Sequence, residues 1–264
     1  MRRVAVLLIA AGLAGCAHAV LSDGPTEVAP DRRVTRLAAR AWIVRHAEPF
    51  PANSLLVEMD DGTLVLCGSP YTAEATRALL GWARKAFGTR PIVAINTHFH
   101  PDALGGNEAL IEAGGRVYGS ELTARLLAER GEAVRALLIA FAEKRPGGAG
   151  AFRTARWLPA TSTFRAVDGL ELAFGGERLE VFYPGPAHSP DNVVVWFPER
   201  HLLFGGCMIL AGERLGNTAD ADLERWPEAI EQLRRFDAAL VVPGHGDRFG
   251  PELLDRTLEV LRLR

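Results

Sequence analysis

A regular alternation of strand-like and helix-like segments is the feature that most limits how this chain can fold. Residues 39–47 and 54–68 are rich in β-forming residues, and Asp-Asp-Gly at 60–62 supplies a hairpin turn within the second stretch. Residues 72–88 have apolar positions at helical spacing. Residues 91–97 are continuously apolar, as expected of a strand that is buried on both faces.

The rest of the chain continues this alternation. Because strands and helices alternate in both halves, we expect an α/β fold in which helices cover both outer faces of two sheets. Residues 145–162 break the periodicity and predict a loop or insert. The other expected elements are helices at 104–113, 120–144 and 223–235, a last helix from 251, and strands at 114–119, 163–184, 192–197, 201–205 and 238–242.

Length and composition predict one globular domain, which we place at residues 34–264. The chain has 264 residues, of which 48% are hydrophobic and 23% charged, so it can bury a substantial core. Its formal net charge of -2 gives no reason to expect nucleic acid or an anionic membrane surface as a partner. Nothing in the sequence demands more than a monomer.

The first 19 residues have the pattern of an export signal. Two arginines precede an apolar run at 4–13 that is too short to span a bilayer, and small residues follow. Leu-Ala-Gly-Cys at 13–16 resembles a bacterial lipobox, which predicts lipidation of Cys16 and an outer-membrane anchor. Cleavage after Ala19 is the alternative, and it would leave a free periplasmic protein. Residues 20–33 are polar without periodicity and predict a tether.

The strongest chemical signal is Thr-His-Phe-His-Pro-Asp, which begins at the end of the apolar run at 91–97. His98, His100 and Asp102 occupy alternate positions, so their side chains can converge on a single ion. Imidazole nitrogens and carboxylate oxygens are ligands that suit zinc. In isolation, the same residues would also fit an ordinary polar turn, so further ligands are needed to support a metal site.

Three later segments each supply one more zinc-type ligand after an apolar run. His188 lies in PGPAHSPDN, Cys207 in LLFGGCMI and His245 in VVPGHGD. Glycine or proline flanks each of them, as is typical of the strand ends where α/β proteins place their sites. Each residue alone would fit an ordinary histidine or a buried thiol. Four such segments in one chain predict a shared metal site.

The ordered set HFHPD, GPAHSPDN, GGCMI and PGHGD resembles the metallo-β-lactamases, and specifically their di-zinc subclass B1, from residue 35 to the end. The helical stretch around 120–160 is similar to the enlarged central insert of one branch of that subclass. The resemblance implies an αββα sandwich of two mixed sheets with helices on both outer faces. It also implies a periplasmic enzyme that hydrolyses the amide bond of penicillins, cephalosporins and carbapenems, giving antibiotic resistance.

By that resemblance, the six ligands divide between two zinc ions. The first ion is held by His98, His100 and His188, and the second by Asp102, Cys207 and His245. Zinc bound by three histidines keeps a position open for water and lowers the pKa of that water to about 7. The second ion is expected to take the charge that develops on the lactam nitrogen. Asp102 is expected to orient the nucleophile, and Cys207 to bind as a thiolate.

Three residues are expected to contact the substrate. Asn217 stands where this subclass points an asparagine toward the opening lactam. Many relatives bind the substrate carboxylate with a lysine three residues after the cysteine ligand, but here that residue is Leu210. Arg214 is the nearest replacement, because a guanidinium can bind a carboxylate in bidentate fashion. Phe50 is expected to lie over the metals on a flap between the first strands.

Two more positions depart from the family pattern. Gly68 stands where relatives commonly have an aspartate near the second zinc, and Ala103 stands where an arginine is frequent. Loss of such neighbouring groups can weaken or retune a metal site. In the insert, Phe152 and Trp157 are expected to wall the cleft.

Three alternatives stay open at this point. The chain could hydrolyse a lactone, thioester or phosphoester, although those relatives usually have histidine where Ala103 stands and a bridging aspartate where Cys207 stands. It could be a surface lipoprotein that only carries zinc. A disulfide between Cys67 and Cys207 would dismantle the second site in an oxidising compartment.

Overall fold

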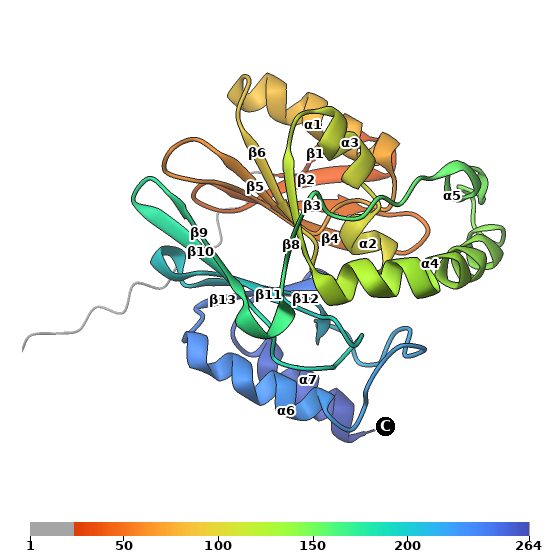
Figure 1. Cartoon of the computed structure of the whole chain (residues 1–264), viewed down its shortest axis with the longest axis vertical. Helices are drawn as coiled ribbons and strands as arrows, with labels where there is room; N and C mark the ends of the chain where they lie inside the picture. The colour runs from red at the N-terminus through yellow and green to blue at the C-terminus, as the bar shows by residue number, and fades with distance from the viewer. Residues whose placement is uncertain (1–23, 264) are drawn as a thin grey trace, which may run out of the picture.

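The computed structural model describes residues 24–263, so the predicted export signal and Cys16 lie outside the described residues. Two β-sheets face each other, and helices lie on their outer sides (Figure 1). Within residues 24–263, one sheet has eight strands and the other has five. No helix in the described part of the chain combines the length and the apolar character needed to cross a membrane.

The first sheet is formed by the N-terminal half of the chain, and its strands follow one another in sequence order. Neighbouring strands are antiparallel from the first to the fifth and parallel from the fifth to the eighth. The strands are β1 Thr26–Ala29, β2 Arg32–Ala38, β3 Ala41–His46, β4 Ala52–Glu58, β5 Leu64–Cys67, β6 Ile92–Ile95, β7 Arg116–Ser120 and β8 Ser162–Phe164.

The second sheet has the order β13-β12-β11-β10-β9. Only β12 and β13 are parallel, so this sheet is mixed like the first. The expected αββα architecture is therefore confirmed. The strands are β9 Leu170–Phe174, β10 Glu177–Phe182, β11 Val194–Phe197, β12 Leu202–Leu210 and β13 Leu240–His245.

Helices cover both outer faces. On the first sheet lie α1 (Ala73–Phe87) and α3 (Asn107–Glu112), and on the second lie α6 (Trp226–Gln232) and α7 (Leu253–Arg262) (Figure 1). Helix α1 begins as the sequence predicts, because the Thr72 hydroxyl accepts a hydrogen bond from the backbone N–H of Ala75 at 3.2 Å. Gly88 ends it with a positive φ of 77°.

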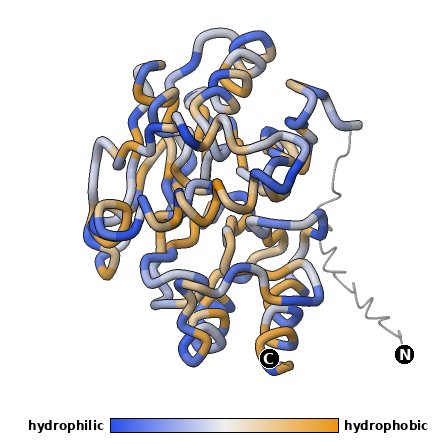
Figure 2. The backbone as a smooth tube through the Cα atoms, turned by 90° about the vertical axis from the view of Figure 1, so that its right-hand side faces the viewer, coloured by the Kyte–Doolittle hydropathy of each residue, from blue (hydrophilic) through white to orange (hydrophobic). Residues whose placement is uncertain are grey.

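The main core lies between the two sheets. Fully buried aliphatic side chains from the first sheet, such as Leu55 and Val57, meet Leu179 and Val195 of the second. Figure 2 shows hydrophobic stretches running through the centre of the molecule, and also along the helices near the C-terminus. Both inner faces are apolar, so most polar ligands lie in loops or at strand ends. Cys207 differs, because the strand expected at 201–205 extends to Leu210 and includes it, at a point where the pairing with β13 is irregular.

Three expected elements differ in detail. Residues 26–29 and 32–33 were expected to belong to a polar tether, but they form β1 and the start of β2. The helix expected at 104–113 is two short helices, α2 (Pro101–Leu104) and α3, which are separated by Gly105 and Gly106. The segment at 145–162 contains a short helix, α5 (Gly150–Thr154). The long helix expected at 120–144 is confirmed as α4 (Glu121–Ala142).

Candidate metal centre

The loop that leaves β6 brings the first three predicted ligands together. His98 and His100 lie in this loop, and Asp102 lies in the first turn of α2. Buried Asn96 fixes the loop, because its amide donates to the Ala103 carbonyl at 3.1 Å and to the Asn107 side chain at 2.9 Å. These hydrogen bonds hold the loop after β6, in which the rings of His98 and His100 lie 4.8 Å apart and His98 lies beside Asp102.

The other three ligands come from the second sheet. His188 lies in the loop between β10 and β11, Cys207 in β12, and His245 at the end of β13. The approach of β13 to β12 requires glycine beside the histidine. A Cβ added at Gly244 would lie 2.6 Å from the Cys207 sulfur. The glycine in PGHGD thus lets the two ligands lie side by side.

The three predicted ligands of the first zinc lie close together and are buried. The ligand atoms of His98, His100 and His188 are all within 4.8 Å of one another. His100 Nδ1 lies 3.2 Å from His188 Nε2, and the three residues are at most 8% exposed. Three buried imidazoles whose ring nitrogens lie this close together are suited to share one cation.

The second group of ligands lies beside the first. Cys207 Sγ is 3.1 Å from Asp102 Oδ2 and 3.3 Å from His245 Nε2, and Asp102 Oδ2 is 3.1 Å from His245 Nε2. His98 Nε2 lies 3.6 Å from Asp102 Oδ1 and so connects the two groups. A thiol, a carboxylate and an imidazole at these distances are an ordinary zinc donor set.

The hydrogen bonds of the imidazoles favour metal binding. The His245 Nδ1–H donates to the Pro51 carbonyl at 2.7 Å, and this bond leaves Nε2 to face the cluster. His100 Nε2–H donates to Asp220 Oδ2 at 3.0 Å, which leaves Nδ1 to face His188. His98 Nε2 is buried and, among the described residues, has no hydrogen-bond partner. Because a buried ring nitrogen without a partner is costly, this atom fits a metal ligand.

Burial controls the protonation of the cluster. It lowers the pKa of His98 to about 3 and that of His188 well below its usual value, so both rings are neutral at neutral pH. Burial, aided by the Asp102 carboxylate, raises the pKa of Cys207. Burial also acts to raise the pKa of Asp102, but the hydrogen bond with His245 and the nearby imidazoles outweigh it and hold that pKa well below the usual range. A bound cation would therefore have to displace the thiol proton of Cys207.

Asp220 is a site residue that the sequence did not single out. Besides accepting from His100, its carboxylate receives a hydrogen bond from Arg130 of α4 at 2.8 Å. The bond from His100, helped by Arg130, lowers the pKa of Asp220 to about 2. Its one signal was its place three residues after Asn217, in a run that also holds other acidic residues.

The predicted substrate residues are not part of the buried cluster. Arg214 and Asn217 are exposed on the loop between β12 and α6, and the Asn217 side chain accepts from the backbone N–H of Ala219 at 3.1 Å. Phe50 stacks on Phe141 of α4, with ring centroids 3.8 Å apart. Contact of these residues with a substrate stays a prediction.

Two positions that depart from the family pattern, Leu210 and Gly68, have local packing or backbone geometry of their own. Leu210 packs with the apolar residues under α6 and α7, and Gly68 has a positive φ of 67° beside the Asp102 backbone. Phe152 and Trp157 are buried in the cluster under α4, 4% and 9% exposed, and Trp157 also lines a pocket beside that helix. That the two residues wall the substrate cleft stays a prediction. Apolar residues in the insert pack inward because α4 and α5 need a core of their own.

The disulfide alternative is not supported. Cys67 and Cys207 are both free and buried. Cys207 faces Asp102 and His245, and burial raises the pKa of the Cys67 thiol. Cys67 is accordingly a small buried residue of β5 rather than a ligand or a bridge partner.

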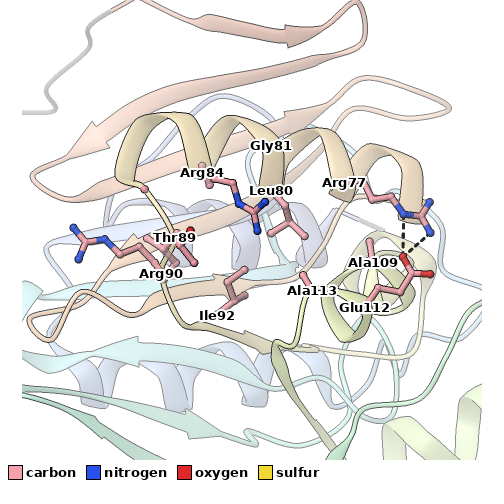
Figure 3. A pocket seen from close by; sticks show the side chains of 13 residues that line it. Arg77, Leu80, Gly81, Arg84, Thr89, Arg90, Ile92, Ala109, Glu112 and Ala113 are labelled. Carbon is pink, nitrogen blue, oxygen red and sulfur yellow. Dashed lines mark hydrogen bonds and ion pairs between the residues drawn. The ribbon is translucent and has the colours of Figure 1, made fainter.

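A pocket of about 340 Å³ lies away from this cluster, between α1, α3 and the start of β6 (Figure 3). Arg77 and Glu112 pair at one end of it at 2.9 Å, and Leu80 and Ile92 form part of its apolar wall. None of the six predicted ligands lines this pocket. We therefore place the functional site at the cluster of six ligand side chains and not at this pocket.

The fold and the cluster define a class, namely metal-binding αββα sandwich proteins. The sequence profile described as the metallo-beta-lactamase superfamily matches residues 47–245. The chain belongs to this superfamily, which confirms the resemblance of its four motifs.

Individual relatives agree with that assignment. The metallo-beta-lactamase type 2 of Bacillus sp. (strain 170) is 34% identical over 238 residues, which cover 87% of this chain and 82% of the relative. The protein of the same name from Pseudomonas aeruginosa is 35% identical over 239 residues, or 87% and 84%. Among solved structures, a metallo-beta-lactamase from Pontibacter korlensis has a TM-score of 0.74 and 34% identity, covering 88% of this chain and 100% of that chain.

Proposed function

We propose that this protein is a zinc-dependent β-lactamase that hydrolyses the amide bond of penicillins, cephalosporins and carbapenems and so gives antibiotic resistance. The observation that carries the proposal is the convergence of six ligand side chains from four segments on one cluster. Relatives named metallo-beta-lactamase type 2, 34–35% identical over most of the chain, support a β-lactam as substrate.

We assign two zinc ions to the cluster, divided between the ligands as the family resemblance implies. When bound, zinc lowers the pKa of a coordinated water and polarises a carbonyl oxygen. The protein contributes neutral imidazoles, because burial keeps His98 and His188 unprotonated. Asp102 stays ionised beside them, so its carboxylate can orient the attacking water by accepting a hydrogen bond.

The loop between β12 and α6 is assigned to substrate binding. Arg214 and Asn217 are exposed there and therefore accessible to a ligand. Because Leu210 carries no charge, Arg214 supplies the positive charge that binds the substrate carboxylate. Asn217 contacts the opening lactam. Phe50 borders the same opening from the β3–β4 turn, where its ring also stacks on α4.

Export is part of the proposal. The signal-like first 19 residues direct the protein to the periplasm, where lipidation of Cys16 anchors it to the outer membrane and it acts as a monomer. Mass measurement of the mature protein separates this outcome from cleavage after Ala19, because only the anchored form carries acyl chains on its first residue.

The test is hydrolysis of a chromogenic cephalosporin by the purified protein. We expect turnover that a chelator abolishes and zinc restores, whereas a His98→Ala variant stays inactive after zinc is added. A panel of a lactone, an acyl thioester and a phosphodiester runs in parallel. Turnover of one of these without β-lactam hydrolysis would assign another hydrolase activity, and zinc binding without any turnover would leave a zinc carrier.

A further inference from the structure

Helix α4 is the long helix of the insert, and it packs directly on the loop that carries the metal ligands (Figure 1). Leu126 and Leu138 of α4 share a buried cluster with Phe99, which lies between two of the histidine ligands. The same cluster contains Leu104 of α2. The insert is thus part of the packing around the metal site, and its polar side chains extend toward that site.

The first polar connection runs from Arg130. Its guanidinium donates to Asp220 Oδ1 at 2.8 Å, and Asp220 Oδ2 accepts from His100 Nε2 at 3.0 Å. The Asp220 side chain is only 13% exposed, whereas that of Arg130 is 46% exposed. Because Asp220 uses one oxygen for each partner, the position of the guanidinium helps to set where the carboxylate holds the imidazole.

The second polar connection runs from Thr123 in the first turn of α4. The Thr123 hydroxyl donates to Asp191 Oδ2 at 2.8 Å, and the Ser189 hydroxyl donates to Asp191 Oδ1 at 2.6 Å. Ser189 directly follows His188, and both Ser189 and Asp191 are fully buried. The Ser120 hydroxyl caps the helix by accepting from the Thr123 backbone N–H at 3.0 Å, so the donor on α4 is held in place.

We infer that Arg130 and Thr123 of α4 are positioning residues, which hold His100 and His188 in the geometry that binds the first metal ion. Two ligands from different sheets are thereby fixed by one rigid helix, through Asp220 and Asp191. Asp220 also ends the stretch with Arg214 and Asn217, so Arg130 restrains the substrate loop as well. The part that concerns this loop rests on the proposed function, whereas the metal-binding part does not.

The test compares Arg130→Met with Arg130→Lys and with a control on the same helix, Arg125→Met. Arg125 is 61% exposed, and its one ion pair among the described residues is a long contact of 4.0 Å with Glu129, so its loss leaves both connections intact. Changes in groups that orient metal ligands typically cost 10–100-fold in affinity, and Arg130 acts one residue further out, so we expect roughly tenfold weaker zinc binding in Arg130→Met. Arg130→Lys, which keeps the positive charge, should retain most of the zinc affinity of the unmodified protein.

Zinc affinity is measured by competition with a chromophoric chelator, so the result does not depend on any substrate. Hydrogen exchange of residues 212–222 in the metal-free protein should be faster in Arg130→Met than in Arg125→Met. Thr123→Val, which keeps the side-chain shape, should weaken zinc binding severalfold without changing that exchange. Unchanged affinity in Arg130→Met, or an equal loss in Arg125→Met, would overturn the inference. If Arg130→Met loses zinc affinity as expected, but neither the unmodified protein nor any variant hydrolyses a β-lactam, the positioning role stands and only the proposed function is rejected.

Discussion

At the scale of single residues, the site depends on which nitrogen of each histidine faces the cluster. Pro51 and Asp220 occupy the outer nitrogens of His245 and His100. These partners lie 194 and 120 residues away in the chain, so no local pattern reveals them. The ligands themselves were predictable, because each stands in a recognisable segment, although Cys207 was expected after its strand and lies inside β12. The hydrogen bonds that orient the ligands were not predictable.

The two buried cysteines should differ sharply in their effect on metal content. Cys207→Ser replaces a thiolate ligand with a hydroxyl that binds zinc poorly, so we expect retention of one zinc ion instead of two and at least tenfold lower hydrolysis. Cys67→Ala is the matched control and should keep both ions, because Cys67 faces the core between the sheets. Native mass spectrometry counts the ions, and two ions in Cys207→Ser would contradict the assignment.

Arg214 should act on substrate binding alone. If its guanidinium binds the substrate carboxylate, Arg214→Ala removes a charge-assisted contact worth about 1.5–3 kcal/mol. We therefore expect KM to rise at least about tenfold with little change in kcat. Steady-state kinetics with a penicillin and a carbapenem measure both constants, and an unchanged KM would remove Arg214 from the site.

At the scale of elements, the turn of the β1–β2 hairpin is connected to helix α2 of the site through His46 and Tyr71. His46 Nε2–H donates to Asp31 Oδ2 at 3.0 Å, and its Nδ1 accepts from the backbone N–H of Tyr71 at 3.3 Å. The Tyr71 carbonyl lies so close to α2 that a Cβ at Gly105 would be 2.1 Å from it. This segment was expected to be a tether, because β1 and the turn after it are too short to show a period of two.

The ion pair at the β1–β2 hairpin should make the free energy of unfolding depend on pH in the acid range. The hydrogen bond from His46 lowers the pKa of Asp31 against the opposing effect of burial. An acid with a lowered folded-state pKa stabilises the fold fully above its unfolded value of about 3.9, and this contribution is lost as the pH falls through the folded value. In metal-free protein, Asp31→Asn should cost about 1 kcal/mol at pH 6 and progressively less toward pH 3.

Urea unfolding at both pH values measures this difference. Asp168→Asn is the control, because that carboxylate is 60% exposed and its ion pair in the described part of the chain is with exposed Arg165, so the substitution should change stability little at either pH. A destabilisation by Asp31→Asn that stays the same down to pH 3 would show that the charge of Asp31 is not what stabilises the hairpin.

At the scale of the whole molecule, the alternation of strands and helices was enough to predict two sheets with helices outside. The register was not predictable, because β12 is apolar along almost its whole length and gives no alternation to align. Nor was the inward packing of Phe152 and Trp157, since an aromatic in an insert can face either a cleft or a core. The ligand cluster followed from the sequence because its six side chains stand in four recognisable motifs, which the sandwich gathers in one place.

The central claim is that this ligand cluster holds two zinc ions, and diffraction from zinc-loaded crystals at the zinc absorption edge tests it most directly. We expect two anomalous peaks. One should lie about 2.0–2.1 Å from a nitrogen of His98, His100 and His188, and the other about 2.3 Å from Cys207 Sγ, with Asp102 and His245 also in contact. A single peak, or no peak within ligand distance of Cys207 when zinc is in excess, would contradict the account.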